Sequence, residues 1–180
     1  MTTGTRPAAV ALLARAVRSA LGETIATVDG MGGDELHAVA HPRANTPGWI
    51  AWHVFRTADV IGSRVGDAPE LWAMRGYAAA WGLPREGNGS GQPTADAQAL
   101  RLPSAEALAL YGRELRDELS ETVGALDGRG LDRRVSAFSG RDFSAADALH
   151  IFVVLHTVRH QGELNLTRTL LELGTPGGGA

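Results

Sequence analysis

Two histidines in the stretch HTVRHQGEL, His156 to Leu164, are the residues best suited to chemistry in this sequence. His156 and His160 stand four positions apart inside an otherwise apolar run. Each residue of an α-helix advances about 100° around the axis, so the two imidazoles would stand one above the other. Neutral imidazole is a common metal ligand, and such a pair is a candidate for half of a metal site. The pair alone is weak support, because the spacing also arises by chance.

A third histidine lies in another segment with helical periodicity. Trp49, Ile50, Val60 and Ile61 recur at helical spacing around His53. Burying a polar group without a partner costs a few kcal/mol, and three imidazoles meeting between two helices would find a common partner in a metal ion. We therefore predict His53, His156 and His160 as metal ligands. The alternative for His53 alone is a core histidine with an ordinary hydrogen-bond partner.

The residue types restrict the kind of metal site. Thr157 stands where a zinc protease of the HExxH type has its catalytic glutamate. Three neutral ligands leave a coordination position open to water or to a substrate atom, unlike a closed structural zinc site. Such a site suits Zn²⁺, Ni²⁺ or Fe²⁺, of which we expect Zn²⁺ or Ni²⁺. His150 falls about 120° away from His156 around a helix, so we leave it out of the site.

Composition excludes several other functions. All 17 basic residues are arginine and no cysteine is present, which excludes Schiff-base chemistry, thiolate metal sites and cysteine nucleophiles. The net charge of -3 predicts no nucleic-acid partner. The N-terminal segment lacks a signal-peptide pattern and no apolar run has membrane-spanning length, so we expect no membrane association and a cytoplasmic location.

The pattern is helical nearly throughout, and it must position the histidines on two different helices. Thr46 and Pro47 begin one of them, as N-cap and first helical residue. We predict an all-α four-helix bundle in one domain, residues 1–180, with residues 175–180 as a flexible tail. The expected helices run from Pro7 to about Val28, from Thr46 to about Arg64, from Ser104 to Leu126 and from Ser144 to about Leu173. Residues 87–96 are expected to be loop, and residues 131–143 a turn or short hairpin.

Three stretches of the sequence resemble the DinB/YfiT-like superfamily: PGWIAWH, HTVRHQGEL and ELWAMRGYAAAWGLP. That family includes mycothiol- and bacillithiol-dependent S-transferases and the metal-binding domain of mycothiol-dependent maleylpyruvate isomerase. The resemblance implies an up-down-down-up four-helix bundle. It also implies a metal triad at His53, His156 and His160, the residues that the periodicity had isolated.

The leading hypothesis for function is a metal-dependent S-transferase. Its thiol, of the mycothiol or bacillithiol type, must arrive as a cosubstrate because the chain has no cysteine. Three alternatives stay open: a metal-dependent hydrolase, a non-catalytic protein that binds a metal or small ligand in a stress response, and a purely structural bundle.

Further residues are candidates around the triad. Glu163 would accept a hydrogen bond from a ligand imidazole or act as a catalytic base, unless it pairs with Arg159 on the helix surface. Trp81 and Tyr77 would line the mouth of a substrate pocket, unless they pack in the core. The apolar stretch IFVVL, residues 151–155, suggests burial on more than one side, and a homodimer is one way to supply it.

Overall fold

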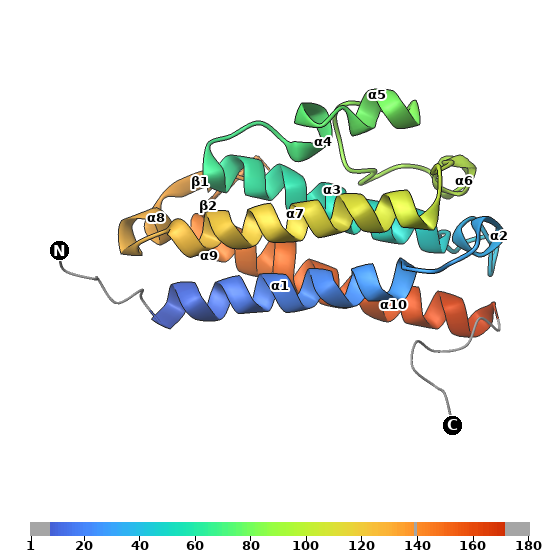
Figure 1. The fold of residues 1–180 in the computed structure, drawn as a ribbon, viewed down its shortest axis with the longest axis horizontal. Helices are drawn as coiled ribbons and strands as arrows, with labels where there is room; N and C mark the ends of the chain where they lie inside the picture. The colour runs from blue at the N-terminus through green and yellow to red at the C-terminus, as the bar shows by residue number, and fades with distance from the viewer. Residues whose placement is uncertain (1–7, 139, 172–180) are drawn as a thin grey trace.

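The computed structural model describes residues 8–138 and 140–171, and most of these residues lie in helices (Figure 1). The long helices are α1 (Ala8–Val28), α3 (Pro47–Gly66) and α7 (Ala105–Ala125). A fourth long helical segment passes through α9 (Ala145–Ala148), η1 (Leu149–Leu155) and α10 (His156–Leu170). The shorter helices are α2 (Gly33–Leu36), α4 (Leu71–Met74), α5 (Tyr77–Trp81), α6 (Thr94–Ala99) and α8 (Gly128–Asp132). The predicted all-α class is confirmed.

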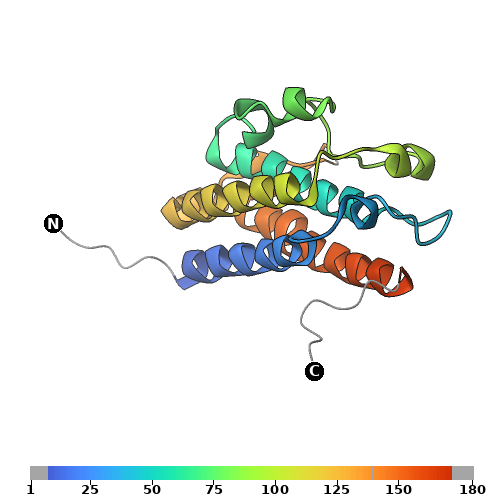
Figure 2. The ribbon, with the colours of Figure 1, turned by 45° about the vertical axis from the view of Figure 1, so that its right-hand side comes forward.

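The four long helical segments of the described residues pack side by side. Helix α1 contacts α7, and α3 contacts both α7 and α10. Figures 1 and 2 show α1 and the α9–α10 segment running in one direction, while α3 and α7 run in the other. The chain must therefore cross from the end of α3 back to the start of α7, and α4, α5 and α6 lie on this crossover (Figure 1).

Helix starts follow the capping residues of the sequence. The Thr46 hydroxyl accepts a hydrogen bond from the Trp49 amide at 3.2 Å, and Pro47 occupies the first turn. The Ser104 and Ser144 hydroxyls cap α7 and α9 in the same way. Each such cap contributes about 1 kcal/mol, so three of the long segments begin where local chemistry favours it. Pro7, the end expected near Leu173 and the tail 175–180 lie outside the described residues.

Helix α3 is the centre of the bundle. Every residue from Pro47 to Ile61 is buried, because α1, α7, α10 and the crossover surround the helix. A helix that is covered on all sides must bury its polar side chains too. This explains how His53 comes to lie in the interior with only 4 % of its surface exposed.

Three local features differ from the sequence-based expectation or refine it. Helix α6 begins at Thr94, inside the segment expected to be loop. Residues 131–143 include a hairpin of β1 (Arg134–Ser136) and β2 (Asp142–Ser144), with Val135 opposite Phe143. The segment η1 has π-helical hydrogen bonding, which no sequence pattern had indicated. No helix among the described residues is both long and apolar enough to span a membrane.

Candidate metal centre

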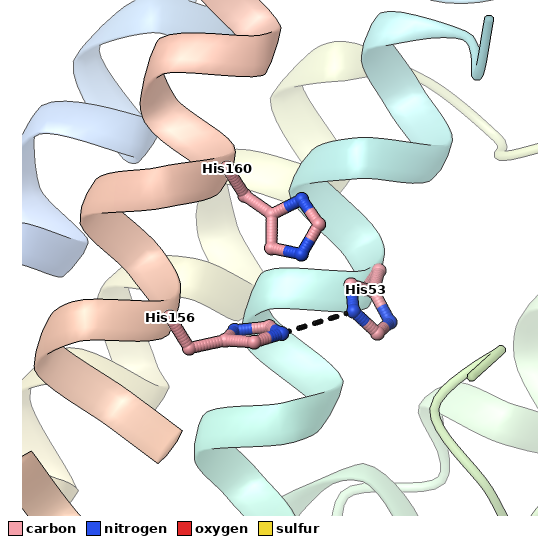
Figure 3. A group of neighbouring side chains, drawn as sticks. All are labelled: His53, His156 and His160. Carbon is pink, nitrogen blue, oxygen red and sulfur yellow. Dashed lines mark hydrogen bonds between the residues drawn. The ribbon is translucent and has the colours of Figure 1, made fainter. Parts of the chain in front are cut away.

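The fold brings the three predicted ligand residues together. His53 projects from α3, while His156 and His160 project from α10, and the rings converge between the two helices (Figure 3). One ring nitrogen from each histidine lies within 4.8 Å of the other two. The ring centroids are 4.5 to 4.9 Å apart. The convergence depends on contact between α3 and α10, which connects residues 103 positions apart.

The His53 ring is held on its edge and on its face. Its Nδ1 donates a hydrogen bond to the backbone carbonyl of Asn88 at 2.5 Å. The indole of Trp49 stacks on it, with centroids 4.8 Å apart and planes inclined by 7°. Burial lowers the pKa of His53, so the ring is neutral and carries one proton. Because that proton is on Nδ1, Nε2 carries the lone pair and acts as an acceptor.

His160 is oriented by a carboxylate. Its Nδ1 donates to Glu163 Oε2 at 2.7 Å, and Asn45 Nδ2 donates to Glu163 Oε1 at 3.1 Å. The hydrogen bond from His160 is the main cause that lowers the pKa of Glu163 below its ordinary value, so the carboxylate is ionised. This contact matches the first of the two roles expected for Glu163. The hydrogen bond leaves His160 Nε2 as the nitrogen available to bind a metal ion.

The His156 ring, unlike the other two, makes no hydrogen bond to a described residue outside the three histidines. Its Nε2 lies 3.0 Å from His53 Nε2, which can only accept, so His156 Nε2 donates the hydrogen bond. Its Nδ1 is buried and has no hydrogen-bond partner among the described residues. The pKa of His156 is lowered to about 3. Burial is the largest cause, and the neighbouring His53 and His160 rings add to it. His156 follows η1 directly, and π-helical turns inside α-helices frequently occur at functional sites.

The donor set fits a divalent ion that prefers nitrogen. Two of the imidazoles, those of His53 and His160, carry their lone pair on Nε2 because a carbonyl and a carboxylate hold the Nδ1 proton, which is the usual arrangement for histidine ligands. The third has a buried nitrogen without a partner. The His160 side chain is 22 % exposed, so the site reaches the protein surface at this residue. His53, His156 and His160 would hold the ion, and Zn²⁺ and Ni²⁺ suit three neutral imidazoles.

Tyr77 and Trp81 lie elsewhere in the described structure. Their ring contacts are with each other and with Trp72 and Tyr111, at centroid distances of 4.9 to 6.2 Å. The Tyr77 hydroxyl donates to Glu114 on α7. This packing fastens the crossover to α7, and it corresponds to the core role weighed as the alternative. A role for either residue in substrate binding stays a prediction.

The sequence did not identify the residues that surround the three histidines. Asn45 and Asn88 lie in connecting segments without periodicity, and nothing in their local sequence marks them as neighbours of a histidine. The contact between Trp49 and His53 could have been predicted from the sequence, because residues four positions apart on a helix lie on the same face. His150, which was left out of the site, is exposed and is not part of the histidine group.

Comparison with known proteins supports the same fold. The chain matches a crystal structure titled as a conserved protein from Enterococcus faecalis with a TM-score of 0.79. The match covers 95 % of this chain and 100 % of that one, at 16 % sequence identity, and therefore shows the fold alone. No curated protein matches the sequence. A family model described as the DinB superfamily matches residues 16–164, most of the chain. This protein thus belongs to the DinB superfamily.

Proposed function

We propose that this protein is a divalent-metal-dependent enzyme that transfers a low-molecular-weight thiol to an electrophile. The observation that carries the proposal is the convergence of His53, His156 and His160 within 4.8 Å of one another. Hydrogen bonds to the Asn88 carbonyl and to Glu163 hold the protons of two of these rings on Nδ1, so that Nε2 carries the lone pair. Nitrogen lone pairs that converge in this way suit a cation, and the buried Nδ1 of His156 has no hydrogen-bond partner among the described residues.

A divalent ion held there would offer an open coordination position and favour the thiolate form of an incoming thiol. The chain has no cysteine, so the thiol is a cosubstrate, and we propose mycothiol or bacillithiol. The side chain of His160 is partly exposed, so the cosubstrate and a small electrophile would reach the site from solvent. The reducing conditions that keep such a thiol available go with the cytoplasmic location expected from the sequence.

Glu163 acts in this proposal by positioning His160. Both of its carboxylate oxygens are engaged, one by His160 Nδ1 and the other by Asn45 Nδ2. A carboxylate in this position holds the proton of His160 on Nδ1 and makes Nε2 a better donor to the metal. A direct proton transfer to substrate would require one of these hydrogen bonds to break.

The homodimer expected from the sequence remains a prediction. Within residues 151–155, Val153 is buried, whereas Ile151 and Leu155 are 37 % and 38 % exposed. A second copy of the chain is the partner we propose for this exposed side. Light scattering checks it: a mass near twice 18.9 kDa agrees with the prediction and a monomer mass contradicts it.

The metal part of the proposal is tested on protein purified without a polyhistidine tag. We expect about one equivalent of Zn²⁺ or Ni²⁺ in the wild type and a large loss in His53→Ala. His150→Ala is the matched control and keeps its metal, because its ring is exposed and outside the group. Unchanged metal content in His53→Ala would contradict the assignment.

The transferase part is tested separately. Metal-loaded wild type is mixed with mycothiol or bacillithiol and with chlorodinitrobenzene, and conjugation is followed by absorbance. We expect turnover that a chelator abolishes and that added metal restores. Tight metal binding without any conjugation by either thiol would reject the transferase and favour the non-catalytic binding protein.

A further inference from the structure

A buried loop residue reaches the metal site from the crossover. Asn88 lies between α5 and α6 and is only 5 % exposed. Its backbone carbonyl accepts the hydrogen bond from His53 Nδ1. Both neighbours, Gly87 and Gly89, have positive φ angles of 85° and 84°, a region that favours glycine. This local backbone aims the Asn88 carbonyl at the histidine.

The Asn88 side chain fastens the same carbonyl to α3. Its Nδ2 donates to the Thr57 hydroxyl at 2.9 Å, and its Oδ1 accepts from the Ser90 amide at 3.1 Å. The Thr57 hydroxyl in turn donates to the backbone carbonyl of His53 at 2.7 Å. The hydrogen bonds therefore form a closed circuit from the ring of His53, through Asn88 and Thr57, back to the backbone of His53.

Packing holds the loop against the same part of α3. A Cβ atom on Gly89 would lie 3.0 Å from ring carbons of both Trp49 and Trp52, so a side chain there would displace the loop or the indoles. Trp49 is the ring that stacks on His53, and its Nε1 donates to Gln92 Oε1 at 3.2 Å. The loop thus acts on the His53 ring in two ways: it contacts Trp49, which stacks on the face of the ring, and its Asn88 carbonyl binds the edge of the ring.

We propose that Asn88 is a positioning residue of the metal site, acting through His53 without touching the ion. Its carbonyl keeps the His53 proton on Nδ1, and its side chain keeps the carbonyl in place. This inference rests on the proposed function, because it assigns Nε2 of His53 to a metal. It gives the crossover loop control over metal affinity. Removing an outer hydrogen-bond partner of a histidine ligand typically lowers metal affinity about 10- to 100-fold.

The test uses two substitutions on the circuit and one control. Asn88→Ala removes the side chain that holds the carbonyl, and Thr57→Val removes the hydroxyl that Asn88 binds while preserving shape. Thr57→Ser keeps the hydroxyl and is the matched control. Zinc affinity is measured by competition with a chromophoric chelator, and the His53 tautomer in zinc-free protein by ¹⁵N NMR of the ring.

We expect Asn88→Ala and Thr57→Val to weaken zinc binding about 10- to 100-fold, while Thr57→Ser stays near the wild type. The ring signals of His53 should change from one Nδ1-protonated species to a mixture of tautomers in the two weakened variants. Wild-type zinc affinity in both of them would overturn the proposal. Weaker binding with an unchanged His53 tautomer would overturn it as well, because that pattern indicates a purely structural effect.

Failure of the metal site itself has a different signature. If His53→Ala binds zinc as tightly as the wild type, the proposed function is wrong whatever the Asn88 variants do. The tautomer of His53 in zinc-free protein still reports on the Asn88 contact in that case. Thr57→Val replaces the hydroxyl by a methyl group and Thr57→Ser removes only the methyl group, so the pair also stays informative if Asn88→Ala does not fold.

Discussion

Helix α3 carries two buried polar centres, at His53 and at Asp59, less than two turns apart, and they are satisfied in opposite ways. The Asp59 carboxylate, 3 % exposed, accepts hydrogen bonds from the amides of Leu71 and Trp72, the hydroxyl of Tyr111 and the guanidinium of Arg56. Those partners come from α3, the crossover and α7, so the fold itself completes this centre. The histidine centre instead directs ring nitrogens toward one another.

This difference separates a centre that the fold satisfies from one that we propose to bind a metal ion. A buried carboxylate that accepts four hydrogen bonds from the protein has its acceptor positions filled. At the histidine centre the buried His156 Nδ1 has no partner among the described residues, and His53 Nε2 has only a neighbouring imidazole, so a cation would fill these acceptor positions. The same loop serves both centres, because the carbonyl of Gly87 accepts from Arg56 and the carbonyl of the next residue, Asn88, accepts from His53.

The largest expected effect comes from breaking the Asp59 centre. Asp59→Asn removes the buried one of the two carboxylates that pair with the fully buried Arg56, Glu70 being the other, and breaking such a buried ion pair costs about 3–5 kcal/mol of unfolding free energy. Asp117→Asn, which breaks an exposed ion pair with Arg18, is the control and should cost about 0–1 kcal/mol. Urea unfolding of both variants measures the two values. Equal losses would show that the Asp59 centre is not structural.

A smaller effect is expected at the histidine centre, and on metal rather than on folding. Glu163→Ala removes the acceptor of the His160 Nδ1 proton, so zinc affinity should fall about 10- to 100-fold. Unfolding of the zinc-free protein should change little. Glu121→Ala, at an exposed position on α7, should leave zinc affinity at the wild-type value. A Glu163→Ala variant that loses stability but binds zinc normally would place this residue with the structural centre.

The third effect is a pH dependence of the zinc-free protein. Burial lowers the pKa of His156 to about 3 and also lowers that of His53, whereas the unfolded chain titrates near 6.5. The unfolded state therefore binds more protons below pH 6.5, and stability falls as the pH is lowered. The slope for each such histidine approaches about 1.4 kcal/mol per pH unit.

Denaturant unfolding in a chelator, from pH 7 to about 5, measures this slope. His156→Gln should flatten it, because the residue that resists protonation is gone. His150→Gln, at an exposed position, should follow the wild type. A slope that is the same in His156→Gln as in the wild type would show that this ring is not held neutral by burial.

Sequence alone predicted the fold class and the three histidines for identifiable reasons. Helical spacing places His156 and His160 on one strip, and the apolar residues around His53 place it in a core. Capping chemistry at Thr46, Ser104 and Ser144 fixes the starts of the long segments within a residue. These features depend on residues near in sequence, which is why they could be predicted without coordinates.

The remaining features depend on tertiary contacts. Asn88 meets His53 only because two glycines with positive φ turn a loop toward α3. Asp59 lies in the apolar stripe of α3, and its partners on the crossover and α7 become its neighbours only after folding. The π-helical turn before His156 arises within apolar residues that an α-helix would accommodate equally well.

X-ray absorption on zinc-loaded protein counts the ligands around the ion, and so tests whether the three histidines bind it together. We predict three imidazole nitrogens at about 2.0–2.1 Å, with one further light atom from water or buffer. His53→Ala should reduce the imidazole count by one. A spectrum with no more than one imidazole, or one that is unchanged in His53→Ala, would show that the three histidines do not bind a common ion.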